Sequence, residues 1–265
     1  MITSPGNARI KTVVRMQQRA KARREEDAFL TEGVKMFLEA PTEQIREVYI
    51  SESFSCSDRK IKSAVAEKLK SVHCETVSAE VFRKISDTCS PQGILCVVRS
   101  FHYQLSDLLH EEHPLLLILE DIQDPGNLGT IVRAGEGAGI DGLILSRETA
   151  DIYNPKTVRG TMGSVYRVPF YYADDLSEII KRLKEKHILV YATAPDAGQD
   201  YDTWDYCRGS AFLIGNEGNG LKKETADLAD CRMKIPMMGA VESLNAGVAS
   251  AVLLYEAARQ RRVKR

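Results

Sequence analysis

The chain has 265 residues, of which 43% are hydrophobic, and its 36 basic residues stand against 37 acidic ones for a net charge of −1. A chain of this length buries enough surface to fold without disulfides, as one large domain or two modest ones. The composition is that of a globular protein, and its charge balance argues against a protein coated in positive charge but leaves room for a local basic face.

The first 24 residues contain no acidic residue. Their basic residues are Arg9, Lys11, Arg15, Arg19, Lys21, Arg23 and Arg24. The apolar residues Ile10, Val13, Val14 and Met16 fit the period of a helix better than that of a strand. The segment therefore predicts a basic helix.

A small α/β unit is predicted to follow. Apolar spacing predicts a second helix over residues 29–40, which Pro41 ends. The next elements expected are a strand at 48–50, a helix near 59–70, a short strand and helix within 72–86, and a strand at 94–98. Residues 101–113 are polar and have the character of a linker, so the predicted domains are 1–105 and 106–265.

The second half opens with Leu115 to Leu119, an unbroken apolar run typical of a strand buried on both faces. Further strands are expected at 142–145, 188–192, 211–214 and 232–236. Helices are expected at 127–138, 154–162, 175–186, 220–229 and 244–262. This alternation predicts a parallel-sheet α/β domain, for which an unknotted doubly wound sheet is the ordinary solution.

Several patterns resemble known binding sites, but their position in the chain or the order of their residues argues against such a site. The glycines of 135–139 close a helix, whereas a dinucleotide loop opens one. The run from Gly215 to Lys222 lacks the P-loop order because Leu221 separates the last glycine from the lysine. The histidines of 110–113 lie in the polar linker, and no Cys-x-x-Cys pair occurs, so no metal site is predicted.

No secretory leader pattern and no stretch of roughly 20 apolar residues is present. These features predict a cytoplasmic protein without membrane association.

Three loops after buried strands carry the polar residues of interest. In the first, Pro125 and Gly126 make the turn, Asn127 is a good helix cap, and Arg133 follows in the helix. The second is the glycine-rich run after the strand at 211–214, which taken alone fits an ordinary turn as well as a loop that lets a ligand approach the backbone. In the third, over 239–245, Ser243 or Asn245 is equally well explained as a cap. Two carboxylates flank the first strand end as turn residues beside this possible site, Asp121 and Asp124.

Together these loops form an ordered set of motifs. The set reads Asn127-x-Gly129-x-x-x-Arg133, Ile214-Gly215-Asn216-Glu217-Gly218-x-Gly220-Leu221, and Ile235-Pro236 followed by Glu242-Ser243-Leu244-Asn245. Over about residues 115–260 it resembles the SpoU (TrmH) RNA methyltransferases of the SPOUT superfamily. The segments Ser4-x-x-Asn7, Thr31-Glu32-Gly33 and Ser90-Pro91-Gln92-Gly93-Ile94-Leu95 are similar, more weakly, to the substrate-binding domain that precedes the catalytic domain in several members.

The resemblance implies an S-adenosylmethionine-dependent enzyme that methylates a ribose 2′-hydroxyl of RNA. It also implies a catalytic α/β domain with a deep trefoil knot, which works as a homodimer behind a small α/β RNA-binding domain. The cofactor-binding positions implied are Thr193, Ala194, Gly215, Asn216, Glu217, Gly218, Ile235 and Leu244. The catalytic positions implied are Arg133, Ser243, Asn245, Asn127 and Glu217.

The chemistry fits these residue types. A sulfonium methyl is already activated, so alignment and deprotonation of a weakly acidic hydroxyl are the main tasks. Family mechanisms propose the motif arginine as the base, but a guanidinium rarely loses a proton. Arg133 is better suited to gripping a phosphate and stabilising the developing alkoxide. Ser243 and Asn245 would then orient the hydroxyl or the arginine.

The basic stretch 9–24 gains a use as a phosphate-contacting surface, with a solvated helical face as the alternative. The basic tail is expected to act likewise through Arg259, Arg261, Arg262, Lys264 and Arg265. The two-domain layout favours ribosomal RNA by analogy. The alternatives are a tRNA ribose 2′-O-methyltransferase and a non-catalytic RNA-binding protein that retains the fold.

Overall fold

The structure, a computed structural model, describes residues 1–263, so Lys264 and Arg265 of the predicted tail lie outside the described residues. The chain divides into two compact units. The first unit comprises Met1–His102 and Asp151–Tyr166, and the second comprises Tyr103–Ala150 and Arg167–Arg265. The sequence-based division at residue 105 did not assign Asp151–Tyr166 to the first unit.

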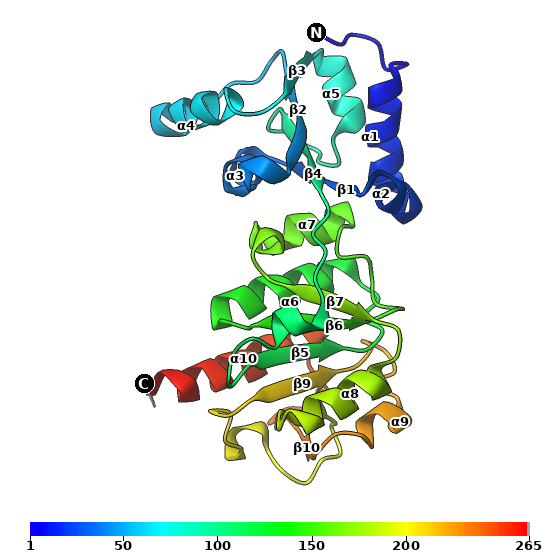
Figure 1. The fold of residues 1–265 in the computed structure, drawn as a ribbon, viewed down its shortest axis with the longest axis vertical. Coiled ribbons are helices and arrows are strands. Elements are labelled where there is room, and N and C mark those ends of the chain that lie inside the picture. The colour runs from blue at the N-terminus through cyan, green and yellow to red at the C-terminus, as the bar shows by residue number, and fades with distance from the viewer. Residues whose placement is uncertain (264–265) are drawn as a thin grey trace. The chain divides into compact units, whose positions relative to one another are not determined.

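The first unit is built on a four-stranded sheet of order β1-β4-β2-β3 (Figure 1). Its strands are β1 (Ala28–Glu32), β2 (Ile45–Ser51), β3 (Cys74–Val77) and β4 (Ile94–Arg99). Its helices are α1 (Ala8–Gln18), α2 (Ala20–Glu26), α3 (Val34–Glu39), α4 (Arg59–Leu69), α5 (Ala79–Ile85) and α7 (Pro155–Thr161). Apolar residues of α1 and α5 pack with one face of the sheet, and those of α3, α4 and α7 pack with the other.

The predicted helix over 29–40 is wrong in its first half. Ala28–Glu32 is a strand, β1, which pairs antiparallel with β4, and only Val34–Glu39 is helical. Gly33 separates the two with φ +106°, a left-handed conformation that glycine adopts at no steric cost. The apolar spacing suited a helix, but pairing with a strand some 65 residues away decided the outcome.

The segment Asp151–Tyr166 completes the core of the first unit. The ring of Tyr153 stacks on Phe29 with centroids 4.3 Å apart, and the Tyr166 hydroxyl donates to the carbonyl oxygen of Met36 at 3.1 Å. Val158 is buried in the same apolar cluster. The chain therefore leaves the second unit after residue 150, supplies α7 to the first unit, and then returns.

An ion pair fastens this segment to α2. The Arg23 guanidinium donates two hydrogen bonds to Asp151 Oδ2, at 2.9 and 2.6 Å, and one to the carbonyl oxygen of Met16. Arg23 is only 4% exposed. This corrects the sequence-based expectation for Arg23, because a buried and fully engaged guanidinium cannot contact RNA phosphate.

We expect Arg23→Ala to lower the free energy of unfolding by about 3 kcal/mol, because it leaves the Asp151 carboxylate without its cation in a largely buried place. Urea unfolding of the full chain measures the change. The control is Lys21→Ala, whose exposed pair with Glu25 is worth well under about 1 kcal/mol. Equal stability of the two variants would contradict the structural role of Arg23.

The second unit is built on a six-stranded, all-parallel sheet of order β10-β8-β9-β5-β6-β7. Its strands are β5 (Leu115–Leu119), β6 (Gly142–Ser146), β7 (Phe170–Ala173), β8 (Leu189–Thr193), β9 (Ser210–Ile214) and β10 (Cys231–Met233). Its helices are α6 (Pro125–Ala138), α8 (Leu176–Glu185), α9 (Lys223–Ala226) and α10 (Ala246–Val263). In Figure 1, α8 lies in front of the sheet, whereas α6 and α10 lie together behind it.

The parallel-sheet prediction is confirmed. One of the two central strands is β5, which lies between β9 and β6 and has five fully buried residues. One strand of this sheet, the four-residue edge strand β7, is not predicted from the sequence. The helix predicted over 220–229 is longer than α9. Among residues 1–263 no helix combines the length and the apolar character needed to cross a membrane.

Candidate functional site

A pocket of about 350 Å³ opens beside the carboxyl ends of β8, β9 and β10. The loop after β9, residues 215–221, and the segment 234–246 supply most of its wall; we call the former the glycine loop. All eight residues that the sequence predicted as cofactor contacts line it: Thr193, Ala194, Gly215, Asn216, Glu217, Gly218, Ile235 and Leu244. The carboxyl edge of a parallel sheet is where such folds bind ligands.

The glycine loop is shaped by close backbone packing. A Cβ at Gly215 would lie 2.2 Å from the carbonyl carbon of Gly220 and 2.2 Å from the nitrogen of Leu221. Gly220 has φ +67°. Asn216 Oδ1 accepts hydrogen bonds from the backbone N–H groups of Gly218 and Asn219, at 2.9 and 3.0 Å. The loop therefore presents backbone to the pocket, with no side chain tolerated at Gly215.

Three predicted polar residues from the three separate motifs meet in one hydrogen-bonded chain. Asn245 Nδ2 donates to Asn127 Oδ1 at 2.8 Å, and Asn127 Nδ2 donates to Glu217 Oε1 at 2.9 Å. Asn245 also caps α10, because its Oδ1 accepts from the N–H of Gly247 at 2.9 Å. The cap interpretation and the site interpretation of Asn245 are thus both compatible with the fold.

Glu217 is held as a carboxylate. Its oxygens also accept from the backbone N–H groups of Gln123 and Asp124, at 3.1 Å each. Burial alone would raise the pKa of Glu217, but the hydrogen bonds from Asn127 and from these N–H groups outweigh it and lower the pKa. This carboxylate therefore stabilises the folded state above its unfolded pKa, and the contribution disappears as the pH falls through the folded value. Such a group is a weak base, suited to positioning Asn127.

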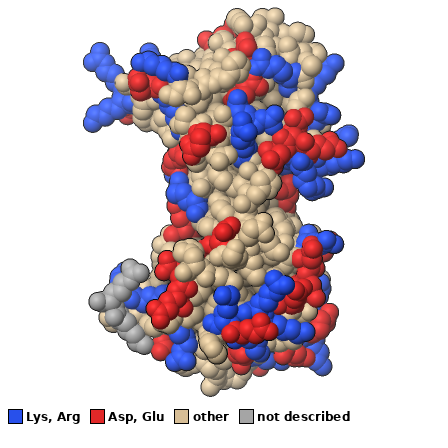
Figure 2. Space-filling view, viewed as in Figure 1, with Lys and Arg blue, Asp and Glu red and all other residues tan. Residues whose placement is uncertain are grey.

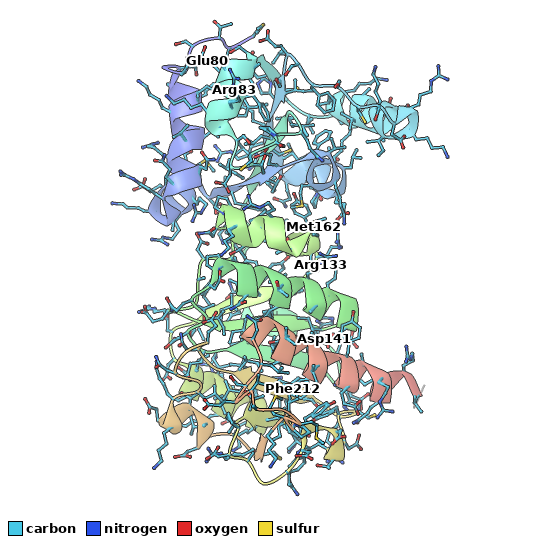
Figure 3. All side chains as sticks on the ribbon, turned by 180° about the vertical axis from the view of Figure 1, so that it is seen from behind. Glu80, Arg83, Arg133, Asp141, Met162 and Phe212 are labelled. Carbon is cyan, nitrogen blue, oxygen red and sulfur yellow. The ribbon has the colours of Figure 1, made fainter. Side chains whose placement is uncertain are left out.

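Ser243 lines the pocket, whereas Asn127, Asn245 and Arg133 are not part of its wall. Arg133 lies exposed on α6 and, within residues 1–263, makes no hydrogen bond or ion pair (Figure 3). It is six residues beyond Asn127 on the same helix, which turns it about 120° away from that residue's face. A single chain therefore brings Asn127, Glu217 and Asn245 together and leaves Arg133 apart from them.

Beyond Arg23, the predicted RNA-contacting residues fall into two groups. Arg9 is paired with Glu47 and Glu75, Arg15 lies 3.6 Å from Glu26, and Lys21 lies 3.8 Å from Glu25. Figure 2 shows the resulting mixture of basic and acidic side chains over α1 and α2. The exposed residues that lack a partner in the described part of the chain are Lys11, Arg19 and Arg24.

In the tail, Arg261 does not fit the predicted role in RNA binding. Its guanidinium donates to the carbonyl oxygens of His113, Pro114, Tyr206 and Arg208, so it fastens the end of α10. Arg259 pairs with Glu256, and Arg262 is exposed.

Two surfaces of the structure are not among the residues predicted from the sequence. On α4, which covers the opposite face of the first sheet from α1, three exposed cations lie in the first turn: Arg59, Lys60 and Lys62. Val65 is the single residue of this helix that is buried, so a polar run of this kind could have been recognised as a surface. The pocket wall also includes Lys234 and Glu242, which belong to the loops already singled out.

The fold and the pocket define an α/β protein that binds a small ligand at the carboxyl edge of a parallel sheet, beneath a polar cluster drawn from three loops. A family model described as the SpoU rRNA Methylase family matches residues 114–255, and one described as the MRM3-like substrate binding domain matches residues 7–96. The chain belongs to the SpoU rRNA methylase family.

Three similar proteins each match more than four fifths of the chain. A 23S rRNA (guanosine(2553)-2′-O)-methyltransferase of Bacillus subtilis, RlmP, is 29% identical over 96% of this chain and 97% of its own length. A 23S rRNA (guanosine-2′-O-)-methyltransferase of Bordetella pertussis, RlmB, is 33% identical over 83% of this chain and 91% of its own. An AdoMet-bound rRNA methyltransferase of Sinorhizobium meliloti superposes with a TM-score of 0.84 at 30% identity, covering 97% of each chain.

Proposed function

We propose that this protein is an S-adenosylmethionine-dependent methyltransferase that methylates a ribose 2′-hydroxyl in ribosomal RNA. The observation that carries the proposal is the hydrogen-bonded chain Asn245–Asn127–Glu217, which ties the three motif loops together beside a glycine-walled pocket. Family membership supports the reaction class, and the names of the relatives support ribosomal RNA as the substrate.

The pocket fits S-adenosylmethionine in size and chemistry. Its volume of about 350 Å³ lies within the range of small-ligand sites. Ile235 and Leu244 offer apolar contact for an adenine, and the glycine loop offers backbone groups that no Cβ screens. The carboxylates of Glu217 and Glu242 suit a cationic ligand. The bound cofactor would supply an activated methyl group on a sulfonium.

The chain's own residues would then orient and stabilise the nucleophile. Ser243, at the pocket wall, and Asn245, beside it, are suited to holding the ribose hydroxyl. Arg133 is suited to gripping a neighbouring phosphate and offsetting the charge that develops on the hydroxyl oxygen. Glu217, kept ionised, would hold Asn127 and through it Asn245 in place.

We extend the proposal to assembly, since Arg133 lies apart from the pocket in one chain. Exposed apolar residues lie on α10, which packs against α6, the helix of Arg133: Val248 is 48% exposed and Tyr255 is 53% exposed. A homodimer through this face of the second unit would cover them. Sedimentation of the full chain tests the dimer. The trefoil knot stays a prediction from the family likeness, as does cytoplasmic location.

Transfer of a labelled methyl group from S-adenosylmethionine to purified ribosomal RNA, followed by mapping of 2′-O-methyl sites, tests the function. The expected result is incorporation at one ribose. Methylation of tRNA alone would show that tRNA, and not ribosomal RNA, is the substrate. Cofactor binding without transfer to any RNA would favour a non-catalytic role. Comparison of ribosomal RNA from cells with and without the protein then identifies the nucleotide.

We assign RNA capture to the first domain, residues 1–105, and catalysis to 106–265. Replacing Lys11, Arg19 and Arg24 together by glutamine is expected to weaken RNA binding at low salt, because these exposed cations neutralise phosphates. The slope of log affinity against log salt should fall by about 2 to 3, so the two proteins converge as salt rises. Filter binding over a salt series measures both.

The matched control replaces Arg59, Lys60 and Lys62 of α4, on the other face of the same sheet. Unchanged binding in this control, with loss in the first triple variant, supports the α1–α2 face. Weaker RNA binding in the α4 variant, with unchanged binding in the first triple variant, would show instead that RNA binds at α4.

A further inference from the structure

Asp121 has a left-handed backbone at the end of β5. Its φ is +55°, and in residues 1–263 only three other non-glycine residues have a positive φ. The conformation is costly for a residue with a Cβ, and aspartate and asparagine tolerate it best. Asp121 is not part of the pocket wall, but it lines a neighbouring cleft. Contact with a ligand in the pocket therefore does not account for its conformation.

The backbone and side chain of Asp121 reach both ends of the glycine loop. Its carbonyl oxygen accepts from Asn216 Nδ2 at 2.8 Å, at the start of the loop. Its Oδ2 lies 2.7 Å from Lys222 Nζ, directly after the loop. Its Oδ1 accepts from the Ser146 hydroxyl at 2.7 Å, and the Ser146 oxygen accepts from the Asp121 N–H at 2.8 Å. The side chain is thereby fixed to β6.

The contact with Asn216 continues into the pocket wall. While Asn216 Nδ2 donates to Asp121, its Oδ1 accepts from the N–H groups of Gly218 and Asn219. The adjacent Glu120, 3% exposed, accepts from the backbone N–H of Lys222 at 2.8 Å. The glycine loop is thus held at both ends by two consecutive residues of one strand end.

The charges agree with this arrangement. Burial raises the pKa of Asp121, but the hydrogen bonds from Lys222 and Ser146 and the charge of Lys222 outweigh it and lower the pKa. The same contact with Asp121 raises the pKa of Lys222. Both groups are therefore charged at neutral pH.

We propose that Asp121 is a positioning residue for the cofactor: its left-handed carbonyl orients Asn216, and its carboxylate holds Lys222, so that the glycine loop is preformed for S-adenosylmethionine. The inference rests on the proposed function. Because Asp121 touches the loop and not the pocket, its loss raises the Kd and KM for the cofactor and spares kcat at saturating cofactor.

Asp121→Ala removes the carboxylate and penalises the left-handed backbone. We expect the Kd for S-adenosylmethionine, measured by calorimetry on the full chain, to rise about tenfold. The matched control is Asp27→Ala, which removes another aspartate of positive φ, +45°, located in the first unit. It is expected to lower the melting temperature and leave the cofactor Kd unchanged.

Two conservative variants separate the contributions. Asp121→Asn tolerates the backbone and retains an acceptor for Ser146, so it should stay within about threefold of the wild-type Kd. Lys222→Met breaks the exposed side of the ion pair without touching the backbone. It should raise the Kd about threefold with an unchanged melting temperature.

A wild-type Kd in folded Asp121→Ala overturns the proposal, as does a loss of affinity that Asp27→Ala reproduces. If Asp121→Ala does not fold, an unchanged Kd in Lys222→Met overturns it instead. Failure of the unaltered protein to bind S-adenosylmethionine overturns the proposed function and this inference together, whereas normal wild-type binding with insensitive variants overturns the inference alone.

Discussion

Arg133→Ala is expected to reduce single-turnover methyl transfer by about 10²–10³-fold, because it removes an electrostatic stabiliser of the developing alkoxide. Cofactor affinity should stay nearly intact, since Arg133 is not part of the pocket wall. Arg133→Lys should also be poor, because one ammonium cannot replace a planar two-pronged donor. The melting temperature should not change, because the side chain is exposed and has no partner among residues 1–263.

The control for this experiment is Arg182→Ala, which removes an exposed arginine of α8 in the same unit. It should transfer methyl groups at the wild-type rate. Near-wild-type turnover in Arg133→Ala removes the residue from the proposed catalytic set. A lowered melting temperature with a normal rate in the folded fraction would show instead that Arg133 has a structural role.

Gly215→Ala is expected to weaken S-adenosylmethionine binding by about 100-fold or more. A side chain at this position would fill space where the sequence predicts that a ligand approaches the backbone. In the structure the new Cβ first meets the backbone of Gly220 and Leu221 at 2.2 Å, so the glycine loop itself must move. Overpacking of this kind costs about 1–3 kcal/mol or more. Calorimetry gives the Kd, and circular dichroism checks the fold.

Gly198→Ala is the matched control, because its Cβ would meet nothing within 4 Å and its φ is not left-handed. Its affinity should equal that of the wild type. Tight binding by Gly215→Ala would mean that the glycine loop rearranges on binding, which would contradict a preformed loop.

Most of the second unit could be predicted because its signals are local. The apolar run of β5 announces a strand buried on both faces, and α8 presents Leu176, Ile179, Ile180 and Leu183 at helical spacing. The pocket residues were predictable for a similar reason, since glycine runs and polar caps after strands mark loops that bind ligands. A four-residue strand at the sheet edge, such as β7, carries too little pattern to be recognised.

The errors at Arg23 and at Phe29 share one cause, which is that the deciding partner is distant in sequence. In the sequence, Arg23 is one member of an ordinary basic run. In the structure it is buried and paired with Asp151, which is 128 residues away. The apolar residues around Phe29 are spaced as in a helix, but pairing with β4 makes this segment a strand. The same holds in the site, where Asn127 and Glu217 are 90 residues apart. From the sequence, only the resemblance to a family predicted that those motifs lie in one site.

The return of residues 151–166 to the first unit has a consequence for synthesis on the ribosome. Phe29 and Phe37 share their apolar cluster with Tyr153 and Val158, so the amino-terminal core is incomplete when its own 102 residues have emerged. Domains usually fold in order of translation. Here the core of the first unit is completed only by residues 151–166, which are synthesised after β5 and β6 of the second unit. Gene fusions that join another enzyme at residue 105 would therefore inherit an unfinished core, and swaps between relatives must carry both pieces.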